Sequence, residues 1–230
     1  MKHVVVLTGA GMSADSGLAT FRDSGGLWEG YDINEVATVE GWQRNPENVL
    51  DFYNHRRKQA FEAEPNKGHE ALARLEEIFE VSIVTQNVDD LHERAGSSHV
   101  LHLHGELRKA RSVKNPELVY DIGGDPIKLG DTAEDGAQLR PDIVWFGEMV
   151  PMMEKAVDVV TRAEILVVIG TSLVVYPAAG LINYTSGKVS KFVIDPSAPD
   201  LHNINEWTHF KDTAATATPR LVDKLLKEYS

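Results

Sequence analysis

Cysteine is absent from the 230-residue sequence. Its absence excludes disulfide bonds, thiol nucleophiles and every zinc site built on thiolates. It is also typical of a reducing compartment, and we expect a cytoplasmic location. The N-terminal stretch "MKHVVVLTGAG" agrees with this expectation, because its apolar run is too short for a signal peptide and lacks a small-residue cleavage site.

Positive charge is scarce, since 23 lysines and arginines stand against 35 aspartates and glutamates, giving a formal net charge of −12. An acidic surface disfavours nucleic acid and anionic membranes as partners, and we expect neither. It would favour a basic segment of another protein. The remaining composition is ordinary for a globular chain that is long enough to form a substantial core.

An uninterrupted membrane-length apolar run is missing as well. The stretch 165–182 carries no charge and is nearly long enough to span a bilayer. However, Gly170-Thr171-Ser172 and Pro177 interrupt it. A buried strand, a turn and the start of a helix explain this stretch better than a membrane span.

Short β-branched apolar runs alternate with helical patterns along the chain. Near-continuous apolar strands are typical of a parallel sheet that is covered on both faces. The expected strands lie within 3–11, 80–87, 99–106, 142–148, 164–172 and 191–197, and the expected helices within 45–64, 67–79, 152–163 and 218–229. This alternation predicts an α/β fold with a doubly wound, Rossmann-like parallel sheet.

Two polar or glycine-rich stretches, 21–42 and 105–141, interrupt the alternation. Both follow expected strand ends. Together with the helix that begins at residue 45, we interpret them as insertions that form a smaller module over the carboxyl edge of the sheet. The predicted division assigns 1–24, 61–104 and 142–230 to the large part and 25–60 and 105–141 to the small module.

The first expected strand ends in a glycine pattern. Gly9, Gly11 and Ala14 match the G-x-G-x-x-G/A dinucleotide fingerprint, in which glycines allow a tight turn and the close approach of a pyrophosphate to a helix N-terminus. A plain glycine turn is the alternative. A dehydrogenase would next show a strand ending in an acidic residue. A flexible loop containing residues 21–23 stands there instead, so we expect a lid over the cofactor.

The strand within 80–87 ends in Gln86 and Asn87, and Asp89 follows two residues later. In such sheets, ligands bind at the carboxyl ends of the strands. A carboxylate beside amides suits a neutral carboxamide, or a positive charge that forms or disappears. Simple helix capping by Asn87 or Asp89 is the alternative interpretation.

The stretch "LHLHGE" (101–106) holds two histidines that would share one face of a strand. They could bind a metal, but zinc would need further ligands that neither a cysteine nor a completed H-E-x-x-H motif provides. His104 lies at the strand end, where an imidazole could act as a general base near neutral pH. We expect His102, one pleat further in, to be a hydrogen-bonded core residue.

Six motifs follow one another along the chain: "GAGMSADSGLATFRD", "TQNVDDLHERAG", "HLHGEL", "LRPDIVWFGE", "VIGTSL" and "ATPRLVDKL". Together, and in this order, they resemble the sirtuin family of NAD-dependent protein deacylases over essentially the whole chain. The resemblance implies one catalytic domain over 1–230 that uses NAD and acts on acylated-lysine proteins or peptides. Its products would be nicotinamide, the free lysine and O-acyl-ADP-ribose.

The resemblance also implies roles for individual residues. His104 matches the catalytic base, with Asn87 and Asp89 beside it at the nicotinamide and ribose pocket. NAD would be held by Gly9, Ala10, Gly11, Phe21, Arg22, Asp23, Gln86, Asn87, Asp89, Gly170, Thr171, Ser172, Asp195 and Ala214. The substrate peptide would pair, as a strand, with Val144, Trp145, Phe146 and Gly147. Asp195 stands where the family commonly has Asn, and a carboxylate can still accept hydrogen bonds from ribose hydroxyls.

Tyr53 and Arg56 stand one helical turn apart on one face. Sirtuins that remove acidic acyl groups carry a Tyr-x-x-Arg pair at this place, so the resemblance implies removal of succinyl and malonyl as well as acetyl groups. A guanidinium can hold a carboxylate with two hydrogen bonds, and a phenol can add a third. The alternative is an ordinary amphipathic helix with Arg56 in solvent and Tyr53 half-buried.

The chain departs from the family in the insertion, where sirtuins usually hold a structural zinc with two cysteine pairs. The first of these positions is Ser112, and 105–141 contains neither cysteine nor histidine. Carboxylates alone make a poor zinc site, so we expect no metal. Apolar contacts would hold the module instead, from Leu118, Val119, Tyr120, Ile122, Ile127 and Leu129.

Three functions remain open at this point. NAD-dependent lysine deacylation is the leading one. An ADP-ribosyltransferase or NAD hydrolase would use the same cleavage of NAD, and the Tyr53 and Arg56 pair argues against it. A non-catalytic NAD-sensing module is the third, and the intact His104 argues against that. A monomer is the family's usual state and is our expectation.

Overall fold

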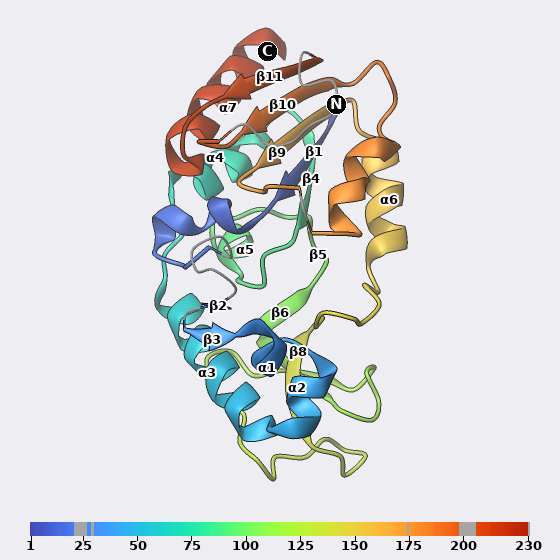
Figure 1. Cartoon of the computed structure of the whole chain (residues 1–230). Coiled ribbons are helices and arrows are strands. Elements are labelled where there is room, and N and C mark those ends of the chain that lie inside the picture. The colour runs from blue at the N-terminus through green and yellow to red at the C-terminus, as the bar shows by residue number, and fades with distance from the viewer. Residues whose placement is uncertain (21–26, 29, 174, 198–205, 230) are drawn as a thin grey trace.

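The structure, a computed structural model, describes residues 1–20, 27–28, 30–173, 175–197 and 206–229. Figure 1 shows a large part built on a parallel sheet, at the top, and a smaller module below it. The module carries two short antiparallel sheets of its own. The predicted α/β fold with an inserted module is confirmed.

Six parallel strands form the large sheet in the order β11-β10-β9-β1-β4-β5. Their bounds are β1 (His3–Thr8), β4 (Glu80–Thr85), β5 (Val100–His102), β9 (Ile165–Ile169), β10 (Ser190–Ile194) and β11 (Trp207–Phe210). The strand order reverses beside β1, and ligands of doubly wound sheets bind at the carboxyl end of such a switch point. The sequence does not predict β11, because the adjacent polar residues Thr208 and His209 interrupt the alternation that marks a half-buried strand.

Side chains of β1 alternate between two apolar layers. Val4 and Val6 pack with α4 and α7, whereas Val5 and Leu7 pack with α6 and η3. The covering elements are α4 (Lys67–Leu75), α6 (Met153–Thr161), η3 (Ala178–Tyr184) and α7 (Ala214–Tyr229), and Figure 1 shows them on opposite faces of the sheet. Every residue of β1 is buried, as the predicted two-sided covering requires.

The uncharged stretch 165–182 divides as its sequence predicts. Its first residues form the buried strand β9, and its last residues belong to η3. Among the residues that the structure describes, no helix is long and apolar enough to cross a bilayer.

Two 3-10 turns follow β1, in place of the helix that the glycine fingerprint predicts. They are η1 (Ala10–Met12) and η2 (Ala14–Ser16), and the second ends at Gly17 with a φ of +88°. Single turns sum fewer peptide dipoles than a full helix does. The expected helix N-terminus at this place is therefore wrong.

The small module joins a helical layer to short antiparallel strands. Its elements are β2 (Leu27–Trp28), β3 (Tyr31–Asp32), α1 (Ile33–Val36), α2 (Val39–Arg44), α3 (Pro46–Glu62), β6 (Gly105–Ser112), β7 (Val119–Asp121) and β8 (Leu139–Ile143); α5 (Leu91–Arg94) follows β4 in the large part. The start of α3 agrees with its sequence signal. The Asn45 side chain accepts from the Asn48 N–H, and Pro46 occupies the first turn.

Residues 142–148 do not form the strand of the parallel sheet that the sequence predicts. β8 ends at Ile143 and pairs antiparallel with β6 in the small module. Trp145 lies beyond it, 2% exposed, within the apolar cluster under α3. The reason is that a short apolar run does not by itself distinguish a parallel from an antiparallel neighbour.

Apolar contacts hold only part of the insertion. Ile127 is buried and Ile122 is partly buried against α3 and β6, but Val119 and Leu129 are 43% and 51% exposed. The expected contribution of those two is therefore wrong. A polar contact also joins the insertion to α3. The Asn54 side chain donates to the carbonyl oxygen of Ile127 (2.8 Å) and accepts from the N–H of Ile127 (2.9 Å).

Candidate active site

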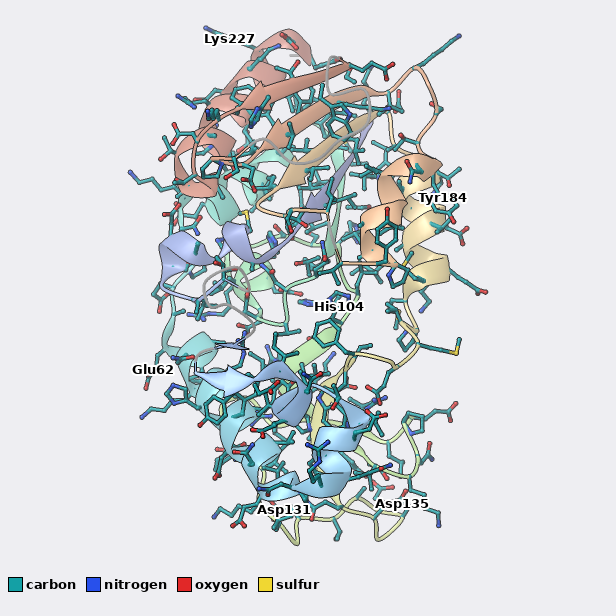
Figure 2. The ribbon with its side chains drawn as sticks, viewed as in Figure 1. Glu62, His104, Asp131, Asp135, Tyr184 and Lys227 are labelled. Carbon is teal, nitrogen blue, oxygen red and sulfur yellow. The ribbon has the colours of Figure 1, made fainter. Side chains whose placement is uncertain are left out.

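A cavity of about 460 Å³ lies where the carboxyl ends of β1, β4, β9 and β10 face the small module. Each described residue with a predicted site role lines it, although these residues come from distant parts of the chain. They are Gly9, Ala10, Gly11, Tyr53, Arg56, Gln86, Asn87, Asp89, His104, Val144, Trp145, Phe146, Gly147, Gly170, Thr171, Ser172, Asp195 and Ala214. Figure 2 labels His104 between the sheet and the module. Phe21, Arg22 and Asp23 lie outside the described residues.

Three glycines bring the loops after β1 and β9 into backbone contact. A Cβ atom at Gly9 would stand 2.6 Å from the Thr171 Cβ, and one at Gly11 would stand 2.7 Å from the Gly170 Cα. Gly170 also has a φ of +60°, which L side chains rarely adopt. Packing within the protein therefore requires these glycines, a reason that the dinucleotide fingerprint does not reveal.

Ser13 joins Asn87 to Asp89. Its hydroxyl donates to Asp89 Oδ2 (3.0 Å) and accepts from Asn87 Nδ2 (3.1 Å), and all three residues are at most 7% exposed. Burial raises the pKa of Asp89. The other Asp89 oxygen accepts from the Leu91 N–H (3.2 Å), two residues further along the chain. The N-cap of α5 is Asp90, without a side-chain cap hydrogen bond, so neither Asn87 nor Asp89 is the helix cap of the alternative interpretation.

Gln86 and Thr171 connect the ends of β4 and β9. Gln86 Nε2 donates to Thr171 Oγ1 (3.1 Å), and Ser172 follows on the cavity wall. Further along the same edge, Asp195 is 3% exposed and its Oδ1 accepts from the N–H of Ser197 (2.8 Å). The result is a polar edge with hydroxyl, amide and carboxylate groups that are fixed by the fold.

His104 carries a neutral imidazole. Its Nδ1 lies 3.2 Å from the carbonyl oxygen of Gln86, which can only accept, so Nδ1 bears the hydrogen and Nε2 keeps its lone pair. Burial lowers the pKa of His104, and the bond to Gln86 offsets only part of that shift. Near pH 7 the ring can therefore accept a proton at Nε2.

His102 is the hydrogen-bonded interior residue that the sequence predicts. Its side chain is 6% exposed, with Nδ1 3.0 Å from the Asn87 carbonyl oxygen and Nε2 2.8 Å from Glu93 Oε1. Burial acts to lower the pKa of His102, but the Glu93 carboxylate, together with Glu106 and the Asn87 carbonyl oxygen, outweighs burial and the pKa is raised. Within the described ranges, no three potential metal ligands come together.

Tyr53 and Arg56 reach the cavity from α3. Tyr53 is 1% exposed, and burial raises the pKa of its phenol to about 12, although the charge of Arg56 opposes the shift. The hydroxyl is therefore a proton donor at neutral pH. Arg56 lines the same wall, and its guanidinium carbon lies 5.7 Å from the centre of the Phe52 ring. This placement differs from the amphipathic alternative of a solvent-exposed Arg56 and a half-buried Tyr53.

The segment from Val144 to Glu148 closes the cavity opposite the strand ends. The N–H of Val144 donates to the carbonyl oxygen of His104 (2.9 Å), and the N–H of Phe146 donates to that of Ala37 (2.9 Å). Trp145 is buried, Phe146 is 43% exposed, and Gly147 has a φ of +89°. The main chain of this segment is thus joined directly to the residue that bears the imidazole.

Several residues of the wall are missing from the sequence-based prediction. Ser13 lies inside the quoted glycine motif, where its hydroxyl was an available signal. Gln59 and Ala60 continue the face of α3 that carries Tyr53 and Arg56, so helical spacing from Arg56 would have found them.

The place of the first zinc cysteine of the family holds a hydrogen-bonded turn. Ser112 Oγ donates to Asp135 Oδ2 (2.7 Å) and accepts from the N–H groups of Lys114 (3.0 Å) and Asn115 (3.1 Å). Asp135 Oδ1 accepts from the N–H of Ala137 (3.0 Å). These donors and acceptors satisfy one another and do not fit a thiolate zinc site.

Residues 9–177 match the Sir2 family. The NAD-dependent protein deacylase of Helicobacter pylori (strain ATCC 700392 / 26695) is 54% identical over 227 residues, which cover 99% of each chain. The NAD-dependent protein deacylase of Bacteroides thetaiotaomicron is 57% identical over 207 residues, which cover 88% of each chain.

Solved structures resemble this chain over both of its parts. A Sir2 homologue in complex with NAD superposes with a TM-score of 0.89 at 39% identity, covering 100% of this chain and 91% of its own. A Sir2 protein bound to a propionylated peptide superposes with a TM-score of 0.79 at 28% identity, covering 99% and 94%.

Proposed function

The chain belongs to the Sir2 family, and we propose that it removes succinyl, malonyl and acetyl groups from protein lysines in an NAD-dependent reaction. The observation that carries the proposal is that one cavity is lined by the neutral imidazole of His104, by the buried phenol of Tyr53 and by Arg56. The imidazole supports the chemistry. The pair supports the choice of acidic acyl groups.

NAD would lie along the strand ends. Its proposed contacts are Gly9, Ala10, Gly11, Gln86, Asn87, Asp89, Gly170, Thr171, Ser172, Asp195 and Ala214, with Phe21, Arg22 and Asp23 from the lid. Buried Asp195 suits ribose hydroxyls, and the small side chain of Ala214 leaves room for a flat base. The amide of Asn87 and the carboxylate of Asp89, both held by Ser13, suit the carboxamide and ribose of the nicotinamide half.

When bound, NAD would supply a ribose carbon to which the acyl oxygen of the modified lysine bonds as nicotinamide leaves, and water would complete the release of the free lysine. His104 would then take a proton at Nε2 from a ribose hydroxyl, which makes that oxygen a nucleophile toward the acyl group. The Nδ1–H bond to Gln86 stabilises the imidazolium that forms. No nucleophilic side chain is needed, which agrees with a sequence that has no cysteine.

The acyl group would extend toward α3. There, Arg56 would hold a distal carboxylate with charge-assisted hydrogen bonds and Tyr53 would donate one more. An acetyl group has no carboxylate, so it would fit the space without gaining these bonds. The substrate main chain would pair with Val144, Trp145, Phe146 and Gly147, and a net charge of −12 favours basic protein segments as substrates.

The proposal also covers location, oligomeric state, partners and metal content. The protein would act as a cytoplasmic monomer without nucleic-acid or membrane partners and without structural zinc, and the turn built by Ser112 and Asp135 supports the last point. The catalytic domain would span 1–230, with 1–24, 61–104 and 142–230 in the large part and 25–60 and 105–141 in the small module.

The proposal is tested by mass spectrometry of matched acetyl-lysine and succinyl-lysine peptides, each with and without NAD, on chelator-treated protein. We expect NAD-dependent loss of both groups, with O-succinyl-ADP-ribose formed from the second peptide. Loss of acetyl alone would refute the role of Tyr53 and Arg56. NAD cleavage without any change in the peptides would favour the ADP-ribosyltransferase or NAD hydrolase, and unchanged NAD would favour the sensing module.

A further inference from the structure

Arg140 lies on β8, outside the cavity wall, and binds the loop that forms part of that wall. We define the peptide loop as residues 144–148. Arg140 is 7% exposed and donates from Nη1 to Glu148 Oε1 (2.8 Å) and from Nη2 to Glu148 Oε2 (3.0 Å). Nη2 also donates to the carbonyl oxygen of Ile143 (2.8 Å), directly before the loop. The planar guanidinium thus grips a carboxylate in bidentate fashion.

Glu148 closes the peptide loop on itself. Its Oε2 accepts from the N–H of Trp145 (2.8 Å), and its own N–H donates to the carbonyl oxygen of Trp145 (3.0 Å). Gly147, between them, takes a φ of +89°, which a glycine adopts without strain. The shape of the loop therefore depends on one carboxylate. Arg140 holds that carboxylate with two hydrogen bonds, and Arg111 Nη2 makes a longer ion pair with its Oε1 (3.5 Å).

Trp145 connects Arg140 to the acyl side of the cavity. The guanidinium carbon of Arg140 lies 3.2 Å from the centre of the indole ring, a cation–π contact. Trp145 packs in the same apolar cluster as Tyr53. The charges of Arg140 and Glu148 both act on the phenol of Tyr53, so the four side chains form one local unit.

We propose that Arg140 is a positioning residue for the acylated peptide. Through Glu148 it fixes the peptide loop for strand pairing, and through Trp145 it holds the wall beside Tyr53. The inference rests on the proposed function, because the partner of the loop is the substrate. Neither Arg140 nor a residue of the peptide loop is among the proposed NAD contacts, so Arg140 should act on the peptide and leave NAD binding unchanged.

Packing alone is the contrasting role for Arg140. A buried ion pair can often be replaced by apolar side chains with little loss of stability, so unfolding measurements alone do not decide the question. Under a packing role, Arg140→Met would be tolerated at least as well as Arg140→Lys. Under a positioning role, Arg140→Lys would be tolerated better than Arg140→Met, because only lysine retains a charge that can reach Glu148.

The test compares Arg140→Met, Arg140→Lys, Glu148→Gln and the double variant Arg140→Met/Glu148→Gln with the wild type. Steady-state kinetics with a succinyl-lysine peptide at saturating NAD gives kcat and KM, and calorimetry gives the Kd for NAD. Arg74→Lys is the control, since Arg74 pairs with Asp223 on the surface of the large part. Thermal unfolding of each variant shows whether it is folded.

We expect Arg140→Met to raise the peptide KM about tenfold or more, because charge-assisted bonds to the loop are lost, with the Kd for NAD unchanged. Arg140→Lys should have a smaller effect, and the double variant should be no worse than Arg140→Met, because both act through one carboxylate. Arg74→Lys should match the wild type.

Wild-type peptide KM in Arg140→Met and Arg140→Lys would overturn the inference, as would a parallel loss of NAD and peptide affinity. If the effects of Arg140→Met and Glu148→Gln on the peptide KM added up in the double variant, the inference that Arg140 acts through Glu148 would be overturned. If Arg140→Met fails to fold, Arg140→Lys and Glu148→Gln carry the test. A wild-type protein that changes no acylated peptide would instead refute the proposed function, which separates the two failures.

Discussion

The parallel sheet and the small module bury their interiors in different ways. In the sheet, all residues of β1 and β9 are buried, and they lie between two apolar layers that helices complete. In the module, Arg57 is 1% exposed, and its guanidinium donates to the carbonyl oxygen of Leu107 (2.6 Å) and to Asn54 Oδ1 (2.7 Å). Burial lowers the pKa of Arg57 to about 10.

This difference separates two tasks. An apolar sheet with polar strand ends offers a rigid edge, on which His104, Asn87 and Asp89 are held by main-chain and hydroxyl partners. A module that already accommodates buried arginines can place Arg56 beside a ligand. We therefore propose that the edge of the sheet carries out the reaction with NAD and that the module selects the acyl group.

Removal of His104 gives the largest expected effect and tests the task of the sheet edge. His104→Ala should lower kcat/KM for succinyl and acetyl peptides alike, by about 10²–10⁴-fold, because both need the same proton acceptor. Steady-state kinetics checks the loss, and calorimetry checks that NAD still binds. A loss confined to one acyl group would break the proposed separation of tasks.

Core substitutions compare the stability of the two interiors. Leu72→Ala should lower the free energy of unfolding by about 2–5 kcal/mol, since Leu72 is 1% exposed within the larger apolar layer. Ile127→Ala should cost less, because the cluster around Ile127 is small. Urea unfolding measures both. Equal costs would show that the module depends on apolar packing as strongly as the sheet does.

Acid should weaken the large part through His69. This ring is 0% exposed, and burial lowers its pKa to about 4. As the pH falls from 6.5 toward 4, the unfolded chain gains a proton that the folded chain does not hold, so stability falls by on the order of 3 kcal/mol. Urea unfolding from pH 7 to pH 4 measures the slope of the free energy of unfolding against pH.

Two substitutions provide the controls for the pH experiment. His69→Gln should reduce the slope, because glutamine does not titrate. Part of the slope should remain, because the buried ring of His92, 4.8 Å from that of His69, also has a lowered pKa. His55→Gln, at an exposed position on α3, is the control for the same substitution away from the core. An unchanged slope in His69→Gln would exclude His69 as the cause.

Arg56→Met tests the task of the module and has the smallest expected effect. Loss of charge-assisted bonds worth about 1.5–3 kcal/mol should lower kcat/KM for succinyl peptides by roughly 10–100-fold. The value for acetyl peptides should stay unchanged. Competition between the two peptides, read by mass spectrometry, gives the ratio directly. Lys58→Met is the matched control, because that neighbouring side chain is 72% exposed.

Much of the fold could be predicted, because short stretches of sequence indicate the individual strands and helices. The apolar runs of β1 and β9 require a sheet that is covered on both faces, and the Asn45-Pro46 pair marks the first turn of α3. The cavity residues could be anticipated because strand ends meet at one edge, so Gln86 and Thr171 become neighbours although 85 positions separate them.

The remaining features depend on tertiary contacts. No pattern in the sequence reveals that β8 pairs with β6, or that Arg140 grips Glu148, because both follow from the path of the chain. Likewise, the close approach of Gly9 to Thr171 has no local signal. Ser13 lies inside a recognised motif and could have been predicted, but its two partners, Asn87 and Asp89, follow a different strand.

The most direct test of the separation of tasks measures binding without turnover. Calorimetry would give the affinity of a succinyl-lysine peptide, in the presence of NAD, for His104→Ala and for His104→Ala/Arg56→Met. We expect the second variant to bind this peptide at least about tenfold more weakly than the first, and both variants to bind the acetyl peptide equally. Equal affinity of the two variants for the succinyl peptide would contradict this expectation.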